Sequence, residues 1–180
     1  MNFLAHLYLS GNDENLLFGN FIGDSVKGQQ YLRFSEEVQK GILLHRFIDH
    51  YTDSHPLVKE SCKRLYPKFK RYSGIINDII YDYFLANNWQ LFHEEELKIY
   101  CQKTYDILGK KRNEMPGKSG MFFDYMISTD RLYNYKIKSE LKIVLRNMGN
   151  RIAAPYPLPS RRVLRRGRRC AGCSAVRPID

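Results

Sequence analysis

The sequence predicts an all-α fold built as a single-domain helical bundle. Apolar residues recur at helical spacing through most of residues 1–150, alternating β-branched runs are few, and no Asn-Gly or Asp-Gly hairpin turn occurs. A chain of 180 residues is also long enough for one domain with a sizeable hydrophobic core. We therefore expect helices packed around one core rather than a sheet.

Capping and helix-breaking residues set the expected helix boundaries. Asp13 is a good N-cap for a helix at about 14–27. Ser35 is another, for a helix that ends near Tyr51, and Pro56 is suited to open the helix after it. A short apolar segment at 2–9, helix or strand, comes first, and the remaining helices are expected at about 57–71, 75–88, 94–109, 119–128 and 131–148.

The composition changes near residue 150. The chain has 29 Lys and Arg against 19 Asp and Glu, but residues 151–180 hold eight of the arginines and one acid, so residues 1–150 are only mildly basic. Residues 151–180 are rich in Ala, Pro and Gly and lack Lys, which predicts an irregular basic C-terminal tail that is disordered, or non-native through a frameshift. Such Arg runs are usually solvated, so we expect no specific nucleic-acid partner.

The sequence indicates neither a membrane nor an oxidising compartment. No run of 18 apolar residues occurs, and the apolar start lacks the basic region of a signal peptide, so we expect a cytoplasmic protein. Cys62 and Cys101 lie in helical patterns and are expected to be buried and reduced. Cys170 and Cys173 form a lone C-x-x-C pair, without the second pair that a zinc ribbon needs.

The stretch Gly41–Pro56 carries a polar stripe on an otherwise apolar helix. His45, Asp49 and Asp53 are spaced four apart, so on a helix they lie on one face. Groups of this kind are costly to bury unless they pair or bind a cation. Two interpretations are open for the stripe itself, namely a buried structural His–Asp pair and a metal site. Asp53 falls beyond the expected helix end.

Three other apolar segments carry a polar pair at the same spacing, namely Asn2/His6, Asn20/Asp24 and Asp78/Asp82. Four such pairs in one small helical domain favour convergence on a shared polar centre, because bundles build metal sites from facing helices in this way. Gly19 and Gly23 lower helix propensity beside one pair, which indicates close approach of a backbone or a ligand, or simply easier helix packing.

Mixed His and carboxylate ligands suit Mn²⁺, Fe²⁺ or Mg²⁺ and support hydrolysis. A carboxylate that is not a ligand could orient the nucleophile or pass on a proton. The cations Lys27, Arg46 and Arg71 lie near these residues in sequence and could clamp a phosphate. Arg46 could equally form a salt bridge with Asp49 or Asp53.

Four motifs together resemble one known family. They are MNFLAHL at 1–7, GNFIGDSVKG at 19–28, the Gly41–Pro56 stretch with its HRFID and TDSHP segments, and Asp78 followed by DYFLA and Trp89. In this order and spacing they closely resemble the bacterial acyl carrier protein phosphodiesterase family over about residues 1–150. Two departures are Tyr83, where the family commonly has His, and the Arg-rich tail in place of a further aromatic-rich helix.

The resemblance implies an HD-domain-like hydrolase that removes the 4′-phosphopantetheine arm from holo acyl carrier protein with a divalent metal, Mn²⁺ above others. For this chain, the resemblance implies that some of the polar residues named above are metal ligands and that others are catalytic carboxylates. We assign His45, Asp49, Asp78 and His6 as ligands and Asp24 and Asp82 as catalytic, and which carboxylates ligate and which move protons stays open. Basic clusters could dock the acidic carrier, or could be ordinary solvated faces: Lys63/Arg64, Lys68/Lys70/Arg71 and Lys110/Lys111/Arg112.

Two other functions remain open. One is an HD-type hydrolase of a small nucleotide or another phosphoester. The other is a degenerate, non-catalytic protein that binds the carrier, which Tyr83 and the altered C-terminus suggest.

Overall fold

The computed structural model describes residues 2–153, and this part of the chain is all-α with no strand. Its helices are α1 (Phe3–Tyr8), α2 (Glu14–Ile22), α3 (Glu36–Ser54), α4 (Pro56–Phe69), α5 (Ser73–Asn87), α6 (Leu97–Lys110), α7 (Ser119–Ser128), α8 (Arg131–Asn134) and α9 (Lys138–Ala153). Short 3₁₀ turns include η1 (Gly23–Ser25), η2 (Gly28–Arg33) and η3 (Lys70–Tyr72). The predicted fold class is confirmed.

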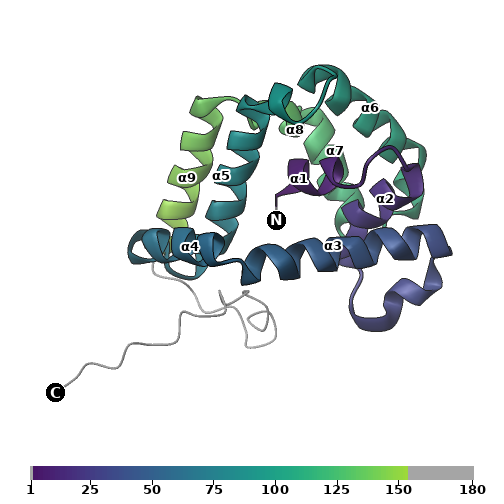
Figure 1. The fold of residues 1–180 in the computed structure, drawn as a ribbon, viewed down its shortest axis with the longest axis horizontal. Coiled ribbons are helices and arrows are strands. Elements are labelled where there is room, and N and C mark those ends of the chain that lie inside the picture. Colours follow the sequence, from purple (N-terminus) through teal and green to yellow (C-terminus); the bar gives the residue numbers. More distant parts are fainter. Residues whose placement is uncertain (1, 154–180) are drawn as a thin grey trace.

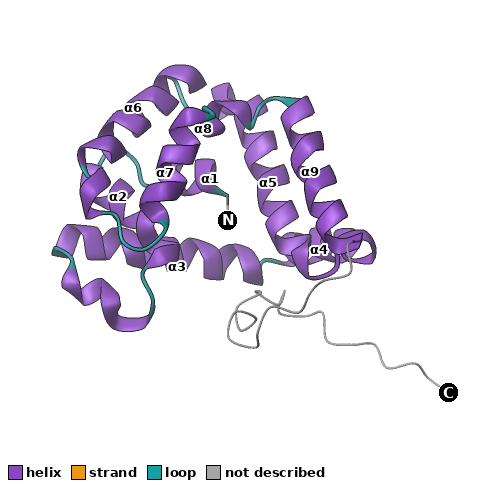
Figure 2. Cartoon of the chain, turned by 180° about the vertical axis from the view of Figure 1, so that it is seen from behind, coloured by secondary structure: helices purple, strands orange, loops and turns teal. Residues whose placement is uncertain are grey.

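The long helix α3 runs along one side of the molecule, and the short α1 lies inside the ring of helices (Figure 1). The pair α5 and α9 packs on α4 at one flank, while α2, α6 and α7 form the other flank (Figure 2). Helix α1 contacts both α2 and α5, so it joins the two flanks. Its Leu4 and Leu7 are fully buried in the hydrophobic core with Phe18, Ile42 and Phe123.

Helices α2 and α3 approach until their backbones touch. A Cβ added at Gly19 would lie 2.2 Å from the carbonyl oxygen of Val38, and one at Gly41 would lie 2.3 Å from that of Leu16. Only glycine fits at such a distance. The close approach that Gly19 predicted is therefore a contact between these two helices.

Several helix boundaries differ from those predicted. Helix α2 ends at Ile22 and passes into η1, whereas α3 continues to Ser54, so that Asp53 is helical. The break comes at His55, which is extended (φ −66°, ψ 134°) as a residue before proline prefers to be. Pro56 opens α4 as expected. The single helix expected at 131–148 is wrong, because residues 135–137 separate α8 from α9.

The predicted domain boundary at residue 150 falls within α9. Residues 154–180 lie outside the described residues, and Cys170 and Cys173 are among them. Cys62 and Cys101 are buried, as expected. Among the described residues, no helix is both long and apolar enough to cross a membrane.

Candidate metal centre

The end of α2 and the middle of α3 bring together the side chains of Asp24, His45 and Asp49. Asp13 caps α2, since its Oδ1 accepts hydrogen bonds from the amides of Asn15 (2.9 Å) and Leu16 (2.8 Å). At the other end, a Cβ on Gly23 would lie 2.4 Å from Cγ of His45. The absence of a side chain at residue 23 therefore lets η1 turn against the His45 ring and place Asp24 beside it.

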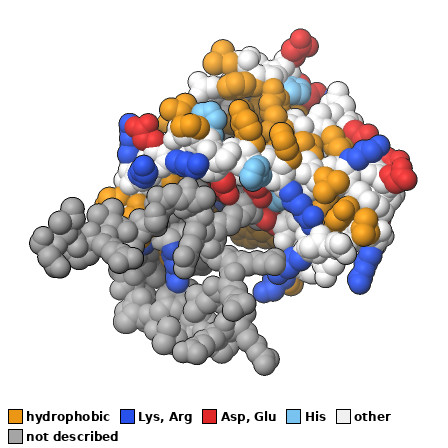
Figure 3. All heavy atoms as spheres, turned by 60° about the horizontal axis from the view of Figure 1, so that its bottom comes forward, with side chains coloured by type: hydrophobic (Ala, Val, Ile, Leu, Met, Phe, Trp, Pro, Cys, Tyr) orange, Lys and Arg blue, Asp and Glu red, His pale blue; other side chains and the backbone are white. Residues whose placement is uncertain are grey.

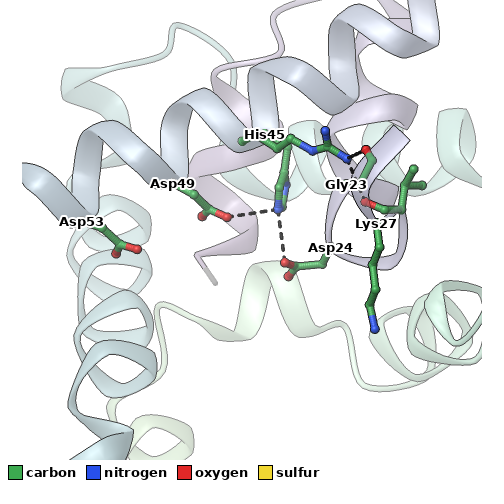
Figure 4. Close-up of a pocket in the computed structure, with 9 residues that line it drawn as sticks. Gly23, Asp24, Lys27, His45, Asp49 and Asp53 are labelled. Atoms are coloured by element: carbon green, nitrogen blue, oxygen red, sulfur yellow. Dashed lines mark hydrogen bonds and ion pairs between the residues drawn. The ribbon is translucent and has the colours of Figure 1, made fainter. Parts of the chain in front are cut away.

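His45, Asp24 and Asp49 form a compact group of possible metal ligands. The Nε2 atom of His45 lies 3.4 Å from Oδ1 of Asp24 and 3.3 Å from Oδ2 of Asp49 (Figure 4). One ligand atom from each residue lies within 4.8 Å of the others. Neighbouring ligands of one octahedral ion are about 3 Å apart, so the group has the spacing of a divalent metal site.

His6 joins this group from α1. Its Nε2 atom lies 3.3 Å from Oδ1 of Asp49, and its ring centroid lies 4.4 Å from that of His45. Both imidazoles are buried, and among the described residues neither Nε2 atom has a hydrogen-bond partner. Buried polar atoms are rarely left without a hydrogen bond, so these two nitrogens indicate a place where a cation fits.

The charges around His45 favour a positive species at this position. Burial lowers the pKa of His45, but the close and negatively charged carboxylates of Asp24 and Asp49 outweigh it and raise the pKa from 6.5 to about 9. At neutral pH and without a metal, the imidazole therefore carries a second proton. A metal that bound Nε2 would have to displace that proton.

The group forms one wall of an open pocket of about 280 Å³. Asp53 also lines this pocket, because α3 extends far enough to present it one turn after Asp49. Lys27 and Arg46 supply the cationic part of the lining. Figure 3 shows acidic and histidine side chains gathered near the centre of one face, with Lys and Arg side chains close by.

The three cationic residues predicted to bind a phosphate lie in different places. Arg46 donates from Nη2 to the carbonyl oxygens of Val26 (3.1 Å) and Gly28 (2.8 Å), so it ties the loop before η2 to α3. Lys27 lies in that loop and is exposed at the pocket. Arg71, by contrast, is exposed on η3, donates to the Tyr72 hydroxyl and does not line the pocket.

The Asp78/Asp82 pair of α5 does not join the group, contrary to our expectation. Asp82 is fully buried, and its carboxylate accepts hydrogen bonds of 3.1 Å from the amides of Leu4 and Ala5 at the start of α1. Burial raises the pKa of Asp82 to about 7, although these two amides lower it. Asp82 therefore anchors α1, and the catalytic role we assigned to it has no support in these contacts. Asp78 is half-buried, and among the described residues the ligand group does not include it.

Tyr83 also lies apart from this group. It lines a second, much smaller pocket between α5, α8 and α9, together with Arg131 and Glu140. The departure from the family pattern at this position thus does not alter the group around His45.

Asn20 was not among our predicted site residues. It is completely buried, and its Oδ1 lies 2.8 Å from Nδ1 of His6 and 3.2 Å from Nδ1 of His45. The signal in the sequence was an amide in the apolar stretch LLFGNFIG, where an unpaired polar group would be costly. Gly23 indicated close approach of a backbone or a ligand, or easier helix packing, and the structure shows instead the close approach of the His45 side chain.

Comparison with known proteins agrees with the resemblance. A family model described as acyl carrier protein phosphodiesterase matches residues 1–165. The chain is 33% identical over 152 residues to a protein of Yersinia pestis with that name, covering 84% of this chain and 79% of the relative. The protein of the same name from an Enterobacter species is 32% identical over the same shares. No solved structure matches, so the HD-domain likeness stays a prediction.

Proposed function

The chain belongs to the acyl carrier protein phosphodiesterase family, and we propose that it is a metal-dependent phosphodiesterase that hydrolyses holo acyl carrier protein to the apo protein and 4′-phosphopantetheine. The observation that carries this proposal is the grouping of Asp24, His45 and Asp49 at the wall of an open pocket. We propose that it acts in the cytoplasm, where such carriers work.

The donor set of two imidazoles and two carboxylates supports a divalent cation such as Mn²⁺, Fe²⁺ or Mg²⁺, and we propose Mn²⁺ because the family resemblance implies it. We propose that Asp24, His45, Asp49 and His6 hold it. A bound divalent cation would lower the pKa of a water molecule and neutralise charge on the phosphoryl oxygens.

The remaining pocket residues can serve the substrate. Water adds its oxygen to phosphorus, the bond from phosphorus to the serine oxygen breaks, and that oxygen takes up a proton. Asp53 is the pocket carboxylate outside the ligand group, and we propose that it orients the water or carries the proton. Lys27 can bind the phosphate directly, and Arg46 keeps its loop against α3.

Of the basic clusters, we propose the one on α4 and η3 as the surface on which the acidic carrier docks. Lys110 forms an ion pair of 2.9 Å with Glu14, and Arg112 forms one of 2.6 Å with Asp124, so that cluster is engaged within the chain. Lys68 and Lys70 instead lie over the rings of Phe69 and Tyr66. We propose these two lysines, with Lys63, as the docking cations.

The test is incubation of the purified protein and Mn²⁺ with holo acyl carrier protein, followed by mass spectrometry of the carrier. We expect the carrier to lose the mass of its phosphopantetheine arm, and Asp106→Asn, an exposed change on α6, to leave the rate unchanged. An unchanged carrier together with turnover of a small phosphodiester would identify the HD-type alternative. A carrier that is bound but never cleaved would identify the non-catalytic one.

A further inference from the structure

Asn20 lies between two imidazoles that come from separate helices. Its Oδ1 is 2.8 Å from Nδ1 of His6 on α1 and 3.2 Å from Nδ1 of His45 on α3. Asn20 itself is on α2 and completely buried. One amide oxygen thus touches both rings of the centre on the side away from the carboxylates.

The other end of the amide determines which way it faces. Nδ2 of Asn20 donates to the carbonyl oxygen of His6 (2.7 Å) and to Oγ of Ser10 (2.9 Å). The Ser10 hydroxyl donates its own proton to the same carbonyl (2.9 Å), so its oxygen is available as an acceptor. If the amide turned over, its oxygen would face a carbonyl oxygen, and two acceptors cannot form a hydrogen bond. Oδ1 therefore faces the rings.

This orientation places a proton on both Nδ1 atoms. An amide oxygen only accepts, so each Nδ1 must donate, and a neutral imidazole has one N–H. In a neutral ring, Nε2 then presents a lone pair. The Nε2 atoms lie 3.3–3.4 Å from carboxylate oxygens of Asp24 and Asp49, and two acceptors repel at this distance, so the arrangement needs either a proton on Nε2 or a metal cation between the atoms.

We propose that Asn20 is a positioning residue that holds His6 and His45 in the Nδ1–H form, so that both Nε2 atoms face one shared cation. The identity of this cation as a divalent metal rests on the function proposed above. In known metal sites a ligating histidine is held in this way by a partner on its other ring nitrogen. Here a single amide does so for two rings at once, which couples their orientations.

The first test uses the metal-free wild-type protein with ¹⁵N-labelled histidine. We expect two ring N–H resonances that are shifted downfield, protected from exchange with water and assigned to Nδ1 of His6 and His45. These protons are present whether or not Nε2 is also protonated. Protonation at Nε2 alone in either ring would overturn the proposal.

The second test compares Asn20→Ala with Asn20→Asp, and calorimetry measures Mn²⁺ affinity. Ala removes the acceptor, so we expect both resonances to be lost and affinity to fall about 10- to 100-fold. Asp keeps an acceptor for both rings, so we expect the resonances to remain and affinity to be at least that of Asn20→Ala. If Asn20 served only to support the fold, Asn20→Asp should instead bind Mn²⁺ more weakly than Asn20→Ala, because Asp turns an acceptor toward the His6 carbonyl oxygen.

Asn77→Ala is the matched control, because Asn77 is also a buried asparagine but lies on α5, outside the ligand group. We expect wild-type affinity from it. Wild-type affinity in a folded Asn20→Ala variant would overturn the proposal, and if that variant does not fold, the wild-type resonances still decide. Wild-type protein that shows both resonances but binds no Mn²⁺ would support the role of Asn20 and refute the metal-dependent function.

Discussion

The α2–α3 contact and helix α5 carry the same kind of sequence pattern but use it differently. Both place acidic residues at intervals of four on an apolar helix. At the α2–α3 contact, Asp24 and Asp49 face ionisable side chains beside an open pocket. In α5, Asp82 faces two backbone amides and is fully buried. Whether such a carboxylate serves chemistry or architecture therefore depends on what the opposing element presents.

The two regions are nevertheless linked through α1. Asp82 holds the first amides of this helix, and His6 lies near its end, against Asp49. The structural carboxylate thus helps to position one histidine of the centre. Substitutions in the two regions should therefore distinguish a carboxylate that serves the chemistry from one that serves the architecture.

The largest effect is expected from Asp49→Ala, since Asp49 is the carboxylate that contacts both His6 and His45. We expect turnover of holo acyl carrier protein to fall on the order of 100-fold or more, with Mn²⁺ affinity reduced at least tenfold. Rates at saturating Mn²⁺ together with calorimetry would measure both. Unchanged turnover would show that the reaction does not depend on this group.

Asp82→Ala should instead affect stability. The amides of Leu4 and Ala5 would lose their acceptor, at about 1–3 kcal/mol for each amide, so we expect a loss of about 2–6 kcal/mol in urea unfolding. Turnover per folded molecule should fall far less than in Asp49→Ala. A variant of normal stability without turnover would restore the catalytic role that we first assigned to Asp82.

The pH dependence of the metal-free protein should report His45. Its pKa is raised from 6.5 to about 9, so its contribution to stability is fully present below pH 6.5 and is lost as the pH rises through 9. The loss should be on the order of 3 kcal/mol and absent in His45→Ala. For the same reason, we expect Mn²⁺ binding near pH 7.5 to release close to one proton, which calorimetry in buffers of different ionisation enthalpy would detect.

The smallest expected effect is the difference in stability between alanine substitutions at two helical glycines. Gly19→Ala drives a methyl group into the α3 backbone, so we expect a loss of about 1–3 kcal/mol. At Gly109 of α6 the nearest group, Cζ of Phe123, is 3.9 Å from an added Cβ, so Ala should gain about 0.5–1 kcal/mol from helix propensity. Unfolding in urea would compare the two, and equal effects would argue against a backbone contact at Gly19.

Local pattern was enough to predict the helices and part of the centre. The spacing of His45 and Asp49 placed both on one helix face, and Asp13 and Pro56 marked helix starts that the structure confirms. The same reasoning ended α3 too early and thereby set Asp53 aside, because Thr52 and Ser54 resemble a break. It also treated Asn20 only as the partner of Asp24 in a pair.

The sequence by itself determined the all-α fold class, most helix starts and which residues could supply ligands, because these depend on periodicity and capping within one segment. Only the tertiary structure decided which ligands meet. Asp24 and Asp82 sit in equivalent local patterns, and their different surroundings come from a backbone contact at Gly19 and Gly41 and from the position of α1 between α2 and α5. Contacts between distant segments depend on packing of the whole core, which no single segment encodes.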